Sequence, residues 1–246
     1  MADNKYAMIL AAGRGERLRP LTDNTPKPLL KAGSRLLIEH HLHSLSKAGF
    51  NNVVINIGHL GQQIIDRIGD GSQYKLSIQY SDERNGVLET GGGIFKALPL
   101  LKSENFLVIN GDVWTDLDLS TLPEEIDSLA HLVLVSNPVH HLQGDFSLQG
   151  NLLHERNDTD PSWTYSGIGI YSHALFHQCE EGPFPLAPLL REHMADGQIS
   201  AEVYDGLWFD IGSNERLVEL NRLLKNRGKG KGRSKAKDEN QNLDSG

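Results

Sequence analysis

The sequence predicts an α/β fold in which helices cover both faces of a mostly parallel sheet. Short apolar segments of strand length alternate with segments whose apolar residues recur at helical spacing, as in successive βαβ units. A glycine-containing loop directly follows the first of these apolar segments. Beyond about residue 137 the apolar segments become shorter, which indicates a smaller, partly antiparallel second part over residues 138–226.

The first part is expected to supply the parallel strands. Apolar and β-branched runs predict strands at residues 6–10, 53–57, 77–81, 106–109 and 132–135. Between them, an apolar residue every three or four positions predicts helices over 38–48, 60–68 and 92–98. Gly49 and Gly69 directly follow the first two helices, where glycine commonly ends a helix.

The second part is expected to add shorter strands to the same sheet system. These strands are predicted at 146–148, 152–155, 163–171 and 208–210, with a helix over 186–195. Ser213 is suited to cap a last helix with a leucine-rich face. Residues 1–226 are therefore predicted to form a single domain. The basic segment 227–246 has almost no large apolar side chain and is expected to be a disordered tail.

Composition excludes several classes of protein. The chain has 246 residues and a single cysteine, so no internal disulfide can form and a cytoplasmic location is expected. Its apolar runs are far shorter than the ~20 residues that span a bilayer, and no signal-peptide pattern is visible, so no membrane partner is expected. The net charge is −8 despite the basic tail, which disfavours general nucleic-acid binding.

The residues after the first strand have the character of a phosphate-binding loop. Small residues would let backbone N–H groups approach a phosphate or a base closely: Ala11, Ala12, Gly13 and Gly15. Four cations flank this loop in an otherwise acidic chain: Arg14, Arg17, Arg19 and Lys27. Prolines on both sides stiffen the backbone of Lys27. This combination suits a triphosphate.

Two common glycine-loop motifs do not fit this segment. The dinucleotide-binding pattern G-x-G-x-x-G would need glycine where Leu18 stands, and the Gly-Lys-Ser/Thr of a Walker loop is absent. For Gly13 and Gly15 taken alone, a flexible surface turn with solvated arginines stays an alternative.

Two aspartates are expected at the ends of strands. Asp112 follows the strand at 106–109, and Asp210 ends the strand at 208–210. Two carboxylates at strand ends could hold Mg²⁺, which prefers oxygen ligands together with substrate phosphates. Either aspartate alone could equally form a turn or cap a helix. His40, His41 and His43 cannot all face one point on a helix, and we predict that they face solvent.

Together and in order, these motifs resemble those of the sugar-1-phosphate nucleotidyltransferases. The resemblance covers residues 5 to about 225 and rests on 10–22 with 26–28, on Asn110-Gly111-Asp112 and on Phe209-Asp210-Ile211-Gly212. Within the family, residues 88–96 and 110–115 look most like the N-acetylmuramate 1-phosphate uridylyltransferases. The resemblance implies a doubly wound, Rossmann-like fold of the nucleotide-diphospho-sugar transferase type. Its nucleotide-binding half would end near residue 137, and its sugar-binding half would span 138–226.

The resemblance also implies an activity. UMP would pass from UTP to a sugar 1-phosphate, N-acetylmuramic acid 1-phosphate in peptidoglycan recycling, with release of pyrophosphate. Nucleotide contacts would come from Leu10, Ala11, Ala12, Gly13, Gly15, Glu16, Arg17, Lys27, Glu89, Thr90 and Gly91. Sugar contacts would come from Asn110, Gly144, Glu155, Gly167 and Asp210. Arg17, Lys27 and Asp112 would be catalytic, and Asp112 and Asp210 would share Mg²⁺.

Two alternatives stay open at this point. The same chemistry could use another pair of substrates, such as GTP with mannose 1-phosphate or dTTP with glucose 1-phosphate. A non-catalytic regulatory paralogue is the second alternative, and the presence of Arg17, Lys27, Asp112 and Asp210 argues against it. The sequence leaves undecided whether the protein is a monomer or a homo-oligomer.

Overall fold

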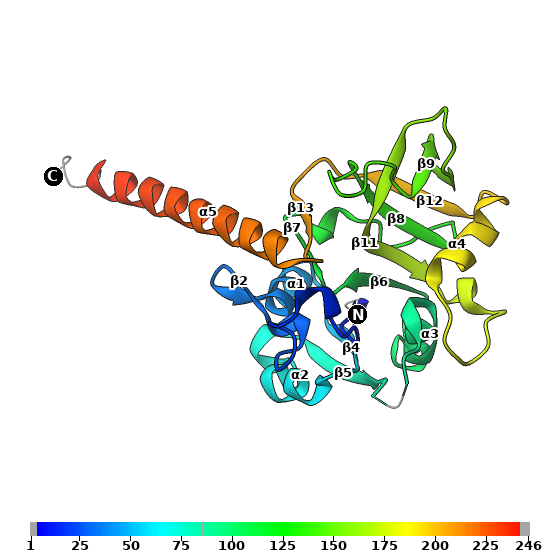
Figure 1. The fold of residues 1–246 in the computed structure, drawn as a ribbon, viewed down its shortest axis with the longest axis horizontal. Helices are drawn as coiled ribbons and strands as arrows, with labels where there is room; N and C mark the ends of the chain where they lie inside the picture. The colour runs from blue at the N-terminus through cyan, green and yellow to red at the C-terminus, as the bar shows by residue number, and fades with distance from the viewer. Residues whose placement is uncertain (1–3, 85, 242–246) are drawn as a thin grey trace.

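The computed structural model describes residues 4–84 and 86–241, with side chains described as far as residue 227. Nine strands of these residues form one sheet (Figure 1). They are β1 (Tyr6–Leu10), β4 (Asn52–Ile57), β5 (Ser77–Asp82), β6 (Asn105–Asn110), β8 (Ala130–Val135), β9 (Phe146–Gln149), β10 (Leu152–Glu155), β11 (Ser162–Ser172) and β12 (Ile199–Val203). Their order across the sheet is β5-β4-β1-β6-β11-β8-β12-β10-β9.

The sheet is parallel in its first part and mixed in its second. Strands β5, β4, β1 and β6 are parallel neighbours. Strand β11 runs antiparallel between β6 and β8, while β12 is parallel to β8. Strands β10 and β9 complete the far edge as an antiparallel pair. The predicted α/β fold with a partly antiparallel second part is therefore confirmed, and both parts contribute to one sheet.

Helices cover both faces of this sheet (Figure 1). They are α1 (Leu37–Lys47), α2 (Gly61–Ile68), α3 (Glu89–Ala97) and α4 (Leu186–Met194). Successive side chains of a strand point to opposite faces, so Ile9 packs in the cluster that contains α1 and α2, whereas Met8 packs with α3 and α4. The strand ends between these layers are left open for a site.

A third apolar cluster joins residues 207–224 to residues 18–37 and to Trp114. Strand β7 (Val113–Thr115) pairs with β13 (Trp208–Asp210), and helix α5 (Asn214–Gln241) follows. A two-stranded hairpin, β2 (Lys31–Ala32) and β3 (Arg35–Leu36), lies beside the start of α5. Leu18 is buried in one cluster with Trp114, Ile211 and Leu217. The segments around Asp112 and Asp210 are thereby brought to the loop after β1.

Several features differ from the sequence predictions. Strands β2, β3, β7 and β12 were not predicted, and α3 begins at Glu89, three residues before the predicted start. The predicted strand at 208–210 forms as β13, but it pairs with β7 in a separate two-stranded sheet instead of joining the nine-stranded one. Helix α5 continues to Gln241 and projects from the body (Figure 1), where the sequence predicted a disordered tail. Gly228, Gly230 and Gly232 disfavour a helix in this segment, whereas its lysine and arginine residues favour one. A helix that is already nucleated by packing of its first turns can extend through such a segment. Residues 242–246 of the predicted tail lie outside the described residues.

Membrane insertion was not expected from the sequence. Among the described residues, no helix combines the length and the apolar character needed to cross a bilayer.

Candidate active site

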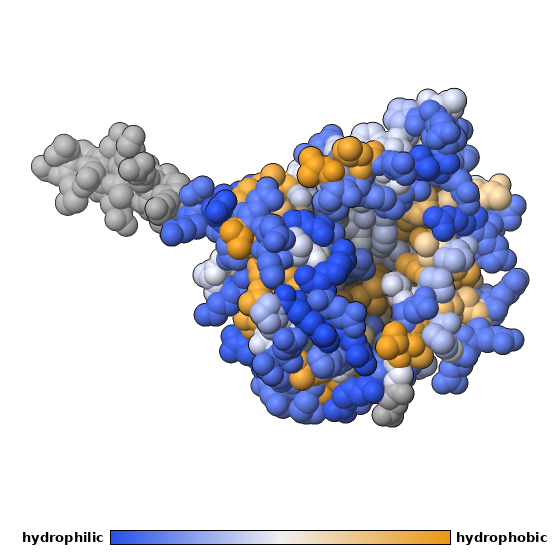
Figure 2. Space-filling model, in the orientation of Figure 1, coloured by the Kyte–Doolittle hydropathy of each residue, from blue (hydrophilic) through white to orange (hydrophobic). Residues whose placement is uncertain are grey.

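A cavity of about 780 Å³ opens at the carboxyl ends of the parallel strands, and Figure 2 shows this face of the molecule hollowed. Open α/β sheets commonly bind ligands at this edge. Most of the predicted nucleotide-binding residues line the cavity: Leu10, Ala11, Ala12, Gly13, Gly15, Glu16, Arg17, Lys27, Glu89 and Thr90. Asn110 and Asp112 line it as well. The fold thus brings together side chains that lie as far as a hundred positions apart in the sequence.

The loop after β1 is held in place by contacts with residues at and just after the end of β4. The backbone N–H of Ala11 donates to Oδ1 of Asn56 at 2.6 Å in a buried contact. Two residues further along, Gly58 lies so close that a Cβ there would be 2.5 Å from the carbonyl oxygen of Ala12. Glycine at position 58 is therefore required for this close approach of two backbone segments. These contacts fix the path of the loop that lines the cavity.

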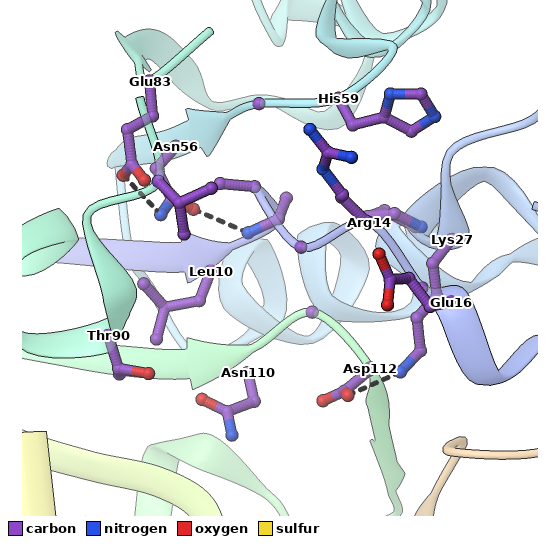
Figure 3. A pocket seen from close by; sticks show the side chains of 18 of the residues that line it. Leu10, Arg14, Glu16, Lys27, Asn56, His59, Glu83, Thr90, Asn110 and Asp112 are labelled. Atoms are coloured by element: carbon purple, nitrogen blue, oxygen red, sulfur yellow. Dashed lines mark hydrogen bonds and ion pairs between the residues drawn. The ribbon is translucent and has the colours of Figure 1, made fainter. Parts of the chain in front are cut away.

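Asn56 is itself held by a buried acid. Its Nδ2 donates to Oε1 of Glu83 at 2.8 Å, and Figure 3 shows Asn56 between Glu83 and the loop. Burial raises the pKa of Glu83, although the hydrogen bond from Asn56 opposes this effect. Gly93 makes room for the pair, because a Cβ there would lie 2.8 Å from Oε1 of Glu83. Glu83 and Asn56 both line the cavity, and the sequence analysis missed them.

Lys27 is paired with the first predicted metal ligand. Its Nζ donates to Oδ2 of Asp112 at 2.6 Å (Figure 3). The lysine side chain is only 11% exposed, and the aspartate side chain is 33% exposed. A buried ammonium needs such a partner, because an unpaired charge there would lose its hydration without compensation. Lys27 therefore fixes the orientation of the Asp112 carboxylate at the edge of the cavity.

The second predicted metal ligand is brought beside the first by strand pairing. Asp210 lies opposite Val113 in the β13–β7 ladder, and the N–H of Ile211 donates to the carbonyl oxygen of Asp112 at 2.8 Å. Oδ2 of Asp210 accepts from Nη1 of Arg216 at 2.5 Å. Asp112 lines the cavity, whereas Asp210 does not belong to its described lining. Carboxylates such as these fit Mg²⁺, because this ion is commonly bound by one or two carboxylates plus substrate phosphates.

The match to known proteins follows this geometry. A sequence profile described as nucleotidyl transferase matches residues 6–142, which is more than half of the chain. The chain belongs to the nucleotidyl transferase family.

Relatives within the family cover nearly the whole chain. It is 50% identical over 227 residues to the N-acetylmuramate alpha-1-phosphate uridylyltransferase of Neisseria meningitidis serogroup B, which covers 88% of this chain and 97% of the relative. It is 32% identical over 223 residues to the protein of the same name from Caulobacter vibrioides, with coverage of 85% and 92%. A crystal structure of UDP-glucose pyrophosphorylase with UDP-glucose has the same fold, with a TM-score of 0.72, 17% identity and coverage of 91% and 99%.

Several residues that the family resemblance implied do not line the cavity. Gly91 is buried against Phe184, whose ring would lie 2.4 Å from a Cβ at position 91, so this glycine serves helix packing. Glu155 lies on β10 and pairs with Arg191 at 3.7 Å. Gly144, with φ of +65°, packs against Asn137. None of these three belongs to the described lining of the cavity.

Gly167 acts through a neighbour that does line the cavity. It has φ of +78° and lies within the register shift of β11 between Tyr165 and Ile168. A Cβ there would lie 2.6 Å from Nδ2 of Asn110. The glycine therefore leaves space for the Asn110 side chain, which is the residue that reaches the cavity.

Arg19 departs from its predicted place at the loop. It pairs with Asp23 at 3.3 Å and does not line the cavity, so three of the four predicted cations remain at the loop.

His41 also departs from prediction. It is buried rather than solvent-facing, with 5% of its surface exposed. Its Nε2 has no hydrogen-bond partner among the described residues, and burial lowers the pKa of His41 to about 4. The sequence spacing of the three histidines did not reveal which one faces the sheet.

Proposed function

We propose that this protein transfers UMP from UTP to N-acetylmuramic acid 1-phosphate, giving UDP-N-acetylmuramic acid and pyrophosphate. The observation that carries the proposal is one cavity lined by the glycine loop, Lys27 and Asp112, in a chain that is 50% identical to a relative named for this activity. By the same resemblance, the product would serve peptidoglycan recycling.

The reaction needs positioning more than acid–base chemistry. A phosphate oxygen of the sugar 1-phosphate attacks the α-phosphorus of UTP, and the bond from that phosphorus to the oxygen bridging to the β-phosphorus breaks. Pyrophosphate leaves with that oxygen. The attacking oxygen is already ionised at neutral pH, so no side chain has to remove a proton. Holding the two anions in line accounts for much of the rate enhancement of such a reaction.

The residues of the chain divide this task. The backbone at 11–13, fixed by Asn56 and Gly58, would hold the base and ribose. Arg17 would lie along the triphosphate, and Lys27 would orient Asp112 and offset phosphate charge. Mg²⁺ bound by Asp112 and Asp210 would supply charge neutralisation on both phosphates.

A substrate panel tests the proposal. Pyrophosphate release is measured with UTP, dTTP and GTP, each combined with the 1-phosphates of N-acetylmuramic acid, N-acetylglucosamine, mannose and glucose. We expect UTP with N-acetylmuramic acid 1-phosphate to give the highest kcat/KM. The variant Asp112→Asn should reduce turnover of that pair by at least ~10²-fold, the scale of losing one preorganised electrostatic group.

The panel also decides between the alternatives. A higher kcat/KM with another pair would replace the proposed substrates. Absence of turnover with every pair, in protein that is folded, would favour the non-catalytic paralogue.

A further inference from the structure

Arg216 lies next to the cavity, beside the lining residue Gly212, although it does not belong to the described lining itself and no sequence motif pointed to it. It belongs to the first turn of α5, and its Nη1 donates to Oδ2 of Asp210 at 2.5 Å. The same nitrogen lies 2.7 Å from Nε2 of His140, which can accept its hydrogen. The Arg216 side chain is 20% exposed. Its guanidinium is therefore held in place by two partners, unlike a solvated surface charge.

A second guanidinium approaches the same point. Gly212 lines the cavity, and a Cβ built on it would lie 2.3 Å from Nη2 of Arg216 and 3.2 Å from Nη1 of Arg17. Among the described side chains, Asp210 is the one acid that forms an ion pair with either arginine. Two cations that converge on one backbone position, with an acid paired to only one of them, are suited to an anion. Arginine binds phosphate oxygens through paired N–H groups.

We propose that Arg216, which lies beside Arg17 at Gly212, binds the phosphate group of the sugar 1-phosphate when Asp210 engages the divalent cation, while Arg17 stays with the triphosphate. The inference rests on the proposed function. Oδ2 of Asp210 accepts from Arg216 in the structure, so a cation ligated by that oxygen competes with the guanidinium for it. Binding of the cation thus releases the N–H groups of Arg216 toward a phosphate. Asp210 thus exchanges Arg216 for the cation, and Arg216 exchanges Asp210 for the phosphate.

The position of Arg216 favours the sugar phosphate over the nucleotide. Lys27 and the glycine loop come from the first half of the chain, whereas Arg216 contacts His140 and Asp210 of the second half. The pyrophosphate product carries the same chemical group, so the experiment needs an arm for each source of phosphate.

The first arm measures cation binding without any substrate. Mn²⁺ is titrated into wild type, Arg216→Met and Arg222→Met by calorimetry. Arg222 lies on the same helix and is exposed, so it is the matched control for loss of one positive charge. We expect Arg216→Met to bind Mn²⁺ about tenfold more tightly, because a competing charge next to Asp210 is gone. We expect Arg222→Met to match the wild type. Unchanged or weaker Mn²⁺ binding by Arg216→Met would overturn the exchange at Asp210.

The second arm measures kinetics in both directions. In Arg216→Met, kcat/KM for the sugar 1-phosphate should fall about 10²-fold, while KM for UTP changes less than threefold. In the reverse reaction, KM for pyrophosphate should stay unchanged. Arg216→Lys keeps the charge without the paired N–H groups and should recover part of the loss. An unchanged KM for the sugar 1-phosphate, or a rise in KM for pyrophosphate instead, would overturn the assignment.

Controls separate the possible failures. The melting temperature of each variant shows whether it is folded. If Arg216→Met does not fold, Arg216→Lys takes its place, because lysine keeps a positive charge beside Asp210. If the wild type turns over no substrate pair, the proposed function fails, whereas the Mn²⁺ titration still decides whether Arg216 competes for Asp210.

Discussion

Gly58→Ala tests whether the end of β4 fixes the nucleotide loop. The added Cβ would lie 2.5 Å from the carbonyl oxygen of Ala12 and 3.2 Å from its carbonyl carbon. Cβ atoms in proteins essentially never approach closer than 3.0 Å, so the two backbone segments must separate by about half an ångström. Neither contact is with a flexible side chain that could rotate away. The loop would therefore move relative to the cavity that it lines.

The size of the effect follows from this displacement. Forcing extra volume into packed structure costs about 1–3 kcal/mol of the free energy of unfolding. Reacting groups must be held within about half an ångström of their productive geometry, and a misplacement of about 1 Å can reduce a rate about 10²-fold. We therefore expect the variant to fold but to lose at least about tenfold in kcat/KM for UTP.

The assay combines calorimetry with UTP, pyrophosphate release and urea denaturation. Gly86→Ala is the matched control, because Gly86 lines the same cavity and a Cβ there would meet no described atom within 4 Å. Full activity and unchanged affinity for UTP in Gly58→Ala would refute the claim that the path of the loop at Ala12 determines nucleotide binding. A loss of the same size in Gly86→Ala would show that the effect is not specific to the β4 contact.

Three further predictions concern a charge, a buried histidine and the last helix. Lys27→Met keeps the aliphatic stem but removes the 2.6 Å contact with Asp112, so kcat should fall about 10²-fold with a smaller change in KM for UTP; an unchanged kcat would contradict this role. His41 has a pKa of about 4 in the folded protein, against 6.5 as its ordinary value, so the unfolded chain takes up its proton first as pH falls. The wild type should therefore lose about 2 kcal/mol of unfolding free energy relative to His41→Phe between pH 7 and 5, measured by urea denaturation; parallel pH profiles would contradict this. Truncation after Arg227 keeps the 2.8 Å ion pair between Arg227 and Asp116, so the melting temperature and kcat/KM should stay unchanged. Turnover that is slower only at low salt would instead indicate that the removed cations steer substrates.

Local patterns in the sequence were sufficient for most of the elements and for part of the site. The predicted strands at 6–10, 152–155 and 208–210 match the observed bounds. The first is a continuous apolar run with a buried centre, so its pattern reports directly on burial, whereas the other two are only partly buried. Lys27 and Asp112 were recognisable for a similar reason, since each lies within a motif of neighbouring residues. Strand β12 was missed because its sequence, Ile-Ser-Ala-Glu-Val, is short and is placed by pairing with β8.

The roles of single glycines were not readable from the sequence. Gly91 was expected to contact the nucleotide and Gly58 was not singled out, yet the structure places Gly91 against Phe184 and Gly58 against the loop. A glycine shows in the sequence only that a side chain is absent. Which atom occupies the space where that side chain would have been depends on a segment far away along the chain.

The sequence by itself determined the alternation of strands and helices, the glycine loop with its cations and the two aspartates, because these depend on residues that are near one another in the chain. Tertiary structure alone decided that Asn56 and Glu83 fix the loop, that Lys27 pairs with Asp112, and that Arg216 reaches Asp210. The Asn56–Glu83 and Lys27–Asp112 contacts join residues 27 and 85 positions apart. Their formation depends on strand order and packing, which bring the ends of several strands to one edge of the sheet.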